Sequence, residues 1–134
     1  MHPLRKLRES GHATVEQNKA LLAEDVVFHS PVLVKAVTGR DAAATIFATS
    51  ASVREGRYVA EHKLDDRTTF LWWKGTIDGY EIESFDVLVD NAQVRLKERT
   101  VAYRPFPAVA IFRAEVYPKL KDVLPPDVWE YPTT

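Results

Sequence analysis

One carboxylate and one guanidinium, in neighbouring strand-like segments, are the strongest candidates for chemistry in this chain. Asp86 lies in an otherwise apolar segment, where a buried carboxylate is costly unless it is protonated or paired. Arg99 lies in the next such segment and could bind an anion or a carbonyl oxygen. Two interpretations stay open: Asp86 is a general acid or base assisted by Arg99, or the two residues form a structural ion pair.

His62 is the third candidate, because an imidazole transfers protons near neutral pH. The face on which it lies depends on the turn at Asp65-Asp66. A two-residue turn places His62 on the same face as Tyr58, whereas a three-residue turn places it on the opposite face. We take the first arrangement as the prediction.

Several kinds of site have no support in the sequence. The four histidines are dispersed and no cysteine is present, so no metal or thiolate site is expected. The chain has neither a phosphate-binding glycine-rich loop nor a Gly-x-Ser-x-Gly motif. We therefore expect no cofactor.

Composition is typical of one globular domain covering residues 1–134. The chain has 134 residues, of which 46% are hydrophobic and 28% are charged. Its net charge of −1 argues against nucleic acid or an anionic membrane as the main partner. No leader peptide and no apolar run of membrane-spanning length is recognised, so we expect a cytoplasmic protein.

Helical patterns are interleaved with one short strand and are followed by a run of four longer strands. They predict helices over residues 3–10, 15–24, 40–55 and 108–123, the last interrupted at Pro118. Thr14 and Gln17 have the spacing of a capping box, Thr38 is expected to cap the third helix, and Gly56 to end it. Strands are predicted over residues 26–30, 58–64, 67–77, 80–90 and 94–104. Helices segregated from a run of antiparallel strands indicate an α+β fold.

The Asp78-Gly79 dipeptide predicts a two-residue hairpin and hence a register for the strands that it joins. In that register Leu71 lies opposite Asp86, and Trp73 lies opposite Ser84. One face then carries Leu71, Trp73, Gly75, Ile82, Ser84, Asp86 and Leu88. The other carries Phe70, Trp72, Lys74, Glu83, Phe85, Val87 and Val89. Because both faces are rather apolar, we expect helices on one and a second copy of the chain on the other.

Three segments, residues 21–32, 79–88 and 101–106, resemble the nuclear transport factor 2-like superfamily, in particular its SnoaL-like branch. The resemblance implies a cone-shaped α+β barrel, in which helices pack over the concave face of a strongly bent antiparallel sheet. Such proteins often dimerise through the sheet. They include ketosteroid isomerases, epoxide hydrolases, polyketide cyclases, dehydratases and binding modules, so the fold alone does not decide the function.

The resemblance also assigns positions within the pocket. Asp86-Val87-Leu88 resembles the isomerase segment whose acid donates a hydrogen bond to an oxyanion, which implies that the Asp86 face is the inner one. The isomerase base is an Asp directly before a Pro, whereas this chain has Ser30 before Pro31. Residues 3–10 also lack the isomerase tyrosine, so isomerisation of ketosteroids is not expected. Epoxide hydrolases of this fold use one Arg and two Asp. Arg99 and Asp86 could supply the Arg and one of the two Asp.

The sequence thus predicts a dimer with an apolar pocket for a small hydrophobic molecule. The residues expected to line it are Ser30, Phe28, Tyr58, Leu71, Trp73, Ser84 and Tyr103, with Asp86, His62 and Arg99 as catalytic groups. The expected reaction is cofactor-free isomerisation, cyclisation, dehydration or epoxide opening. The alternative is a non-catalytic ligand-binding or dimerisation module. Ser30 favours this alternative, because it occupies the position of the isomerase base.

Overall fold

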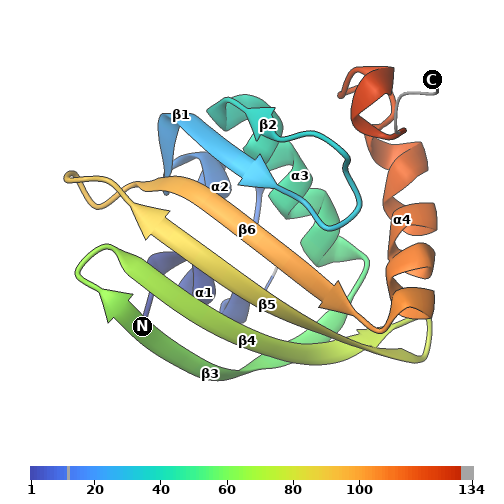
Figure 1. The fold of residues 1–134 in the computed structure, drawn as a ribbon, viewed down its shortest axis with the longest axis horizontal. Helices are drawn as coiled ribbons and strands as arrows, with labels where there is room; N and C mark the ends of the chain where they lie inside the picture. The colour runs from blue at the N-terminus through green and yellow to red at the C-terminus, as the bar shows by residue number, and fades with distance from the viewer. Residues whose placement is uncertain (12, 131–134) are drawn as a thin grey trace.

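One curved sheet forms the frame of the fold in the computed structural model, which describes residues 1–11 and 13–130 (Figure 1). Its six strands are β1 Leu22–His29, β2 Val37–Thr38, β3 Glu55–Asp65, β4 Thr68–Ile77, β5 Tyr80–Asp90 and β6 Leu96–Arg104, in the order β2-β1-β6-β5-β4-β3. The predicted α+β class and curved, cone-like sheet are confirmed. The sheet is mixed rather than purely antiparallel, because β1 and β6 run parallel, and it stays open between β2 and β3.

The β4–β5 hairpin has the predicted register. Leu71 pairs with Asp86 and Trp73 with Ser84. Asp78 and Gly79 have φ values of 48° and 79°, the left-handed values that a type I′ turn requires. The predicted inner face is confirmed as well, since Leu71, Trp73, Ile82, Ser84, Asp86 and Leu88 are all buried.

The second helix is much shorter than predicted. The capping box of Thr14 and Gln17 is present, but α2 Val15–Lys19 ends well before residue 24. The chain then enters β1, which pairs with β6 from Leu22 onward. Leu22 and Val26 are fully buried there, so burial against the sheet overrides the helical propensity of residues 20–24.

The third helix, α3 Arg40–Ser52, is also shorter than predicted. Its N-cap is Gly39, without a side-chain hydrogen bond, because Thr38 belongs to the short strand β2. The predicted role of Gly56 is wrong, since this glycine lies inside β3 and pairs with Gly75 of β4. The backbone oxygen of Lys74 and the ring of Trp73 occupy the space that a Cβ atom at position 56 would need, which explains why glycine lies there.

Helices cover the concave side of the sheet (Figure 1). The first, α1 Pro3–Glu9, buries Leu4, and α3 buries Ile46 and Phe47. The last, α4 Phe106–Leu120, begins two residues before the prediction and continues through Pro118 without interruption. Within the described residues no helix is both long and apolar enough to cross a membrane.

The segment after α4 packs against the core. It contains the short 3₁₀ helix η1 Pro126–Val128. Leu124, Val128 and Trp129 are buried, and the backbone N–H of Val34 donates to the carbonyl oxygen of Val128 at 2.8 Å. This segment therefore covers one end of the cone and holds the loop that precedes β2.

Candidate functional site

Asp86 and Arg99 form a buried ion pair on the inner face of the sheet. The Nη2 and Nε atoms of Arg99 both donate to Oδ2 of Asp86, at 2.7 and 3.1 Å. Asp86 is 0% and Arg99 3% exposed. The structure thus has the ion pair that the sequence left as one of two interpretations. The second oxygen, Oδ1 of Asp86, is buried without a hydrogen-bond partner in the described part of the chain.

The carboxylate and the surrounding rings hold Arg99 as a cation. Burial is the largest single influence and lowers the pKa of Arg99, but the charge of Asp86, the nearby Tyr58 and Tyr103, and the hydrogen bond to Asp86 together raise the pKa above its ordinary value. The guanidinium lies 4.5 Å from the ring centre of Phe47 and 5.5 Å from that of Phe28. Phe28 thus faces the interior, as predicted, and packs beside Arg99.

Next to the ion pair, one residue from each of four adjacent strands lies side by side on the inner face. Tyr58 of β3 pairs with Trp73 of β4, which pairs with Ser84 of β5, which pairs with Tyr103 of β6. Directly opposed residues of neighbouring strands are in side-chain contact range. We call Tyr58, Trp73, Ser84 and Tyr103 the inner row. Asp86 follows Ser84 on the same face of β5 and so lies beside this row.

Arg54 lies over the inner row. It lies between α3 and β3 and is only 7% exposed. Its guanidinium carbon is 4.7 Å from the ring centre of Trp73 and 5.0 Å from that of Tyr103. Burial, and next the nearby charge of Arg8, lower the pKa of Arg54 to about 10, so it remains a cation at neutral pH. Neither Nε nor Nη1 has a hydrogen-bond partner among the described residues.

Arg8, on α1, covers the other end of the row. Its guanidinium carbon lies 5.5 Å from the ring centre of Tyr58 and 5.8 Å from that of Trp73. The side chain is half-buried, and its Nη1 atom is buried without a partner in the described chain. Neither arginine is among the site residues predicted from the sequence. A signal existed for Arg8, which lies one helical turn after the buried Leu4 and therefore shares its face; for Arg54 there was no periodic signal.

Two hydroxyl groups of the inner row are unpartnered as well, within the part of the chain that the structure describes. The Tyr58 hydroxyl and the Ser84 Oγ are buried and have no hydrogen-bond partner in the described residues. We call Arg8, Arg54, Tyr58, Ser84, Asp86 and Arg99 the interior polar cluster. More than nine in ten buried polar groups of native proteins are hydrogen-bonded, and an unsatisfied one costs about 1–3 kcal/mol. Several unpartnered donors beside one unpartnered acceptor can bind a polar group of a ligand.

The structure brings most of the predicted pocket residues together on the inner face. Ser30 differs from them, because its hydroxyl takes part in a local turn. Leu71, Trp73 and Ser84 are buried on the inner face, and Tyr103 is half-buried there, edge-on to Phe112. Ser30 lies just after β1, where its Oγ accepts a hydrogen bond from the Val32 N–H at 3.2 Å. Its hydroxyl therefore closes a local turn.

The predicted inward placement of His62 is wrong. An irregularity between Tyr58 and Ala60 inserts an extra residue into β3, and this reverses the alternation of the side chains beyond it. His62 consequently pairs with Phe70 and stacks on it, with ring centres 6.4 Å apart, on the outer face of the sheet. The imidazole is exposed and lies on the side opposite Asp86.

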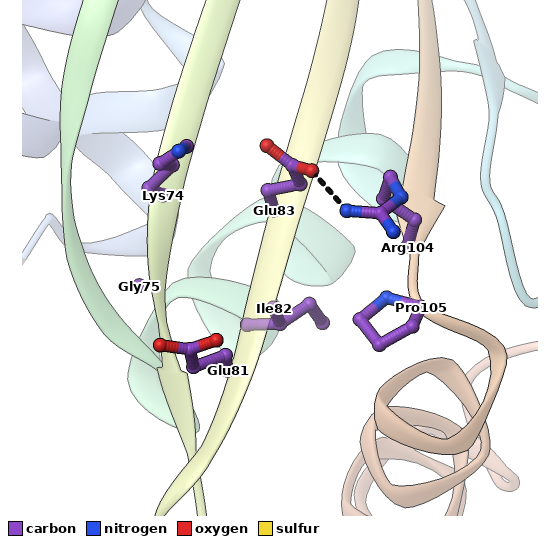
Figure 2. Close-up of a pocket in the computed structure, with 7 residues that line it drawn as sticks. All are labelled: Lys74, Gly75, Glu81, Ile82, Glu83, Arg104 and Pro105. Carbon is purple, nitrogen blue, oxygen red and sulfur yellow. Dashed lines mark hydrogen bonds and ion pairs between the residues drawn. The ribbon is translucent and has the colours of Figure 1, made fainter.

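A surface hollow of about 290 Å³ lies apart from the interior polar cluster (Figure 2). It is lined by Lys74, Gly75, Glu81, Ile82, Glu83, Arg104 and Pro105. Figure 2 shows Glu83 paired with Arg104 at its centre, and the Trp72 Nε1–H also donates to Glu83 at 2.8 Å. Arg104, followed by Trp72, lowers the pKa of Glu83. The charges of Glu83 and Arg104 therefore compensate each other.

Solved structures of other proteins share this fold. An uncharacterised protein with a cystatin-like fold from Silicibacter pomeroyi is 25% identical over 90% of this chain and 87% of its own, with a TM-score of 0.81. A steroid delta-isomerase from Pseudomonas aeruginosa is 20% identical over 92% of this chain and 95% of its own, with a TM-score of 0.75.

A third match is more distant. The epoxide hydrolase/cyclase-like enzyme SalBIII, which acts in pyran ring formation in the polyether salinomycin, is 13% identical over 79% of this chain and 87% of its own, with a TM-score of 0.61. No family model and no curated protein matches the chain. Identities of this size establish the shared fold and leave the chemistry to the side chains of this chain.

Proposed function

This chain has the fold of nuclear transport factor 2-like proteins, and on that premise we propose that it binds a small, largely apolar organic molecule inside the cone. The observation that carries the proposal is the interior polar cluster, whose unpartnered atoms all lie on the concave side of the sheet. A ligand with one or two polar atoms would satisfy them. Ligand sites are commonly apolar hollows with a few convergent polar groups.

The walls around the cluster suit a flat or aliphatic molecule. Trp73 and Tyr103 present ring faces, and Phe112 closes the side toward α4. Leu71 and Val101, which flank Asp86 across the sheet, add aliphatic surface. Binding requires the guanidinium groups that now cover Trp73 to move aside, and long arginine side chains can do so with their charged ends still near the cluster.

The binding proposal is tested with four probes: 2-naphthoate, trans-cinnamate and the amide of each. Isothermal titration should detect binding of at least one probe to the native protein. Ser84→Val replaces an inner-row hydroxyl by two methyl groups and narrows the site, so affinity should fall by about tenfold, equivalent to about 1.4 kcal/mol. Val87→Ala, on the outer face of the same strand, should leave affinity unchanged. Absence of binding by all four probes, or binding unaffected by Ser84→Val, would refute the proposal.

Acid/base catalysis is a second candidate function, favoured by the free oxygen of Asp86. Oδ1 is buried beside the inner row while Oδ2 holds Arg99, so Oδ1 could take a proton from a bound molecule or from a water beside it. Isomerisation, cyclisation, dehydration and epoxide opening all use such a step. The ion pair also suits the non-catalytic alternative, in which Asp86 only anchors Arg99.

Catalysis is tested by turnover of styrene oxide and of a β,γ-unsaturated ketone, followed by gas chromatography. The native protein should convert at least one of them, and Asp86→Asn should lower the rate by about 100-fold or more, the usual contribution of a positioned base. Probe affinity and the folded fraction are measured in parallel, because the amide also deprives Arg99 of its counter-charge. Probe binding without conversion would assign the protein to the non-catalytic alternative.

We also propose that two copies pair through the outer face of the sheet. Phe70, Trp72 and Phe85 stack there with ring centres 6.0–6.3 Å apart, and Val87 beside them is 37% exposed. Contiguous aromatic surface of this kind marks protein interfaces.

The pairing has a simple test by light scattering coupled to size exclusion. The native chain should elute as a dimer, and Phe85→Lys should bring the mass down to the 15.2 kDa of one chain. Val94→Lys, a change of the same kind at a 70% exposed loop residue, should leave the dimer intact. A native monomer, or a dimer that survives Phe85→Lys, would contradict the proposed interface.

A further inference from the structure

Resting on the proposed binding function, we propose that the ligand of the cone carries a carboxylate and that Arg54 and Arg8 bind it. The ligand class is then a small monocarboxylic acid with a flat apolar body. The acid group would lie at the guanidinium groups above the inner row, and the body would lie against the ring faces of Trp73 and Tyr103.

The charges inside the cone do not balance. The interior polar cluster contains three guanidinium groups, of Arg8, Arg54 and Arg99, and the carboxylate of Asp86. Both hydrogen bonds that Asp86 accepts come from Arg99. Neither Arg54 nor Arg8 forms an ion pair with any described residue, so two cations remain without a counter-charge.

Acidic residues near α1 are already committed elsewhere. Glu61 accepts from Arg5 Nη1 at 3.3 Å and from the backbone N–H of His2 at 2.9 Å. Glu9 accepts from Arg5 Nε at 2.9 Å. Asp90 pairs with the His2 ring at 3.0 Å. A counter-ion for the two arginines therefore has to come from outside this set of residues.

Arg54 and Arg8 repel each other where water is largely excluded. Arg54 is more than nine-tenths buried, and the charge of Arg8 is the second largest cause, after burial, that lowers the pKa of Arg54. Both guanidinium groups lie over the same indole, that of Trp73. An anion between them would remove the repulsion and occupy unpartnered donors from both side chains.

Carboxylate is the anion that these surroundings favour. Guanidinium groups form short, charge-assisted hydrogen bonds with carboxylates and keep their charge at any physiological pH. The remaining surroundings are aromatic rings and hydroxyls. A singly charged group attached to an apolar body suits such a site better than a strongly hydrated polyanion does.

The experiment compares matched acids and amides, namely 2-naphthoate with 2-naphthamide and trans-cinnamate with trans-cinnamamide. Titration calorimetry should show the acid binding about tenfold or more tightly than its amide to the native protein. Arg54→Met should reduce the ratio of acid affinity to amide affinity to about one. Arg54→Lys should keep part of the preference for the acid, and Arg8→Met should lower that preference. Arg57→Met removes an exposed arginine of β3 and is the matched control that should keep the full ratio.

The outcomes separate this inference from the binding function on which it rests. Acid and amide binding equally well to the native protein, with both weakened in Ser84→Val, would overturn the carboxylate proposal and leave the binding function in place. A preference for the acid that persists in both Arg54→Met and Arg8→Met would place the anion site elsewhere and also overturn it. Failure of every acid and amide to bind would overturn both proposals together.

Discussion

Replacing Asp86 by Leu is expected to lower the free energy of unfolding by about 3–5 kcal/mol, the usual cost of removing one partner of a buried ion pair. Asp86 is fully buried, and Arg99 is 3% exposed. Without the carboxylate, a third uncompensated guanidinium would remain inside the cone, beside those of Arg54 and Arg8. Urea denaturation at neutral pH measures the loss.

The matched control is the double variant Asp86→Leu with Arg99→Met. Apolar side chains of similar volume can replace a buried pair at little or no cost, so the double variant should recover most of the stability lost in Asp86→Leu. Losses that simply add in the double variant would mean that packing, and not charge, explains the effect of Asp86→Leu.

This result bears directly on any test of catalysis. Because an uncharged residue at position 86 leaves Arg99 without its partner, loss of turnover in Asp86→Asn has two possible causes. The double-variant measurement gives the size of the structural cause. Turnover is then measured at a temperature where Asp86→Asn is still folded and still binds the probes. A loss of turnover under those conditions is assigned to the missing proton acceptor.

Replacing Gly75 by Ala is expected to cost about 3 kcal/mol, at the upper end of the range for overpacked cores. A Cβ atom on Gly75 would lie 2.0 Å from the backbone oxygen of Glu55 and 2.4 Å from the Trp73 ring. Backbone oxygen cannot swing away as a flexible side chain does, so β3 and β4 would have to separate. Gly56, the partner of Gly75, is equally constrained, with Lys74 O at 2.3 Å from its Cβ position.

Thermal and urea unfolding of Gly75→Ala measure this cost. Thr76→Ala, at the next and exposed position of β4, is the control, and its effect should stay within the roughly 1 kcal/mol spanned by strand propensities. Because the glycine pair leaves room for the Trp73 ring, Gly75→Ala should also weaken probe binding. A variant as stable as the native chain would show that the two strands can separate locally without loss.

A short stretch of sequence determined much of the inner face. Asp78-Gly79 favours a two-residue turn because both positions accept left-handed backbone angles. Once that turn is in place, the period of two along each strand places Trp73, Ser84 and Asp86 on one face. Local rules suffice here, since the two strands are adjacent in the chain.

Local patterns failed where distant segments compete for the same residues. Residues 22–24 have good helical propensity, but pairing with Leu96 far along the chain draws them into β1. The inserted residue near Val59 in β3 turns His62 outward. No residue type near Val59 predicts this insertion from the sequence. Gly56 looks like a helix terminator in sequence, whereas its function is to make space beside Gly75 and Trp73.

Only the tertiary structure shows that Arg8 and Arg54 belong to the interior polar cluster. The sequence pointed to Asp86 and Arg99 because a charge in an apolar strand is visible in the period of the strand. Arg54 lies between a helix and a strand, and Arg8 lies on a helix remote from both in sequence. Their guanidinium groups meet over one indole only after α1 and α3 have packed on the concave sheet. Charge balance inside a protein depends on distances between folded segments, and no periodicity along the chain encodes those distances.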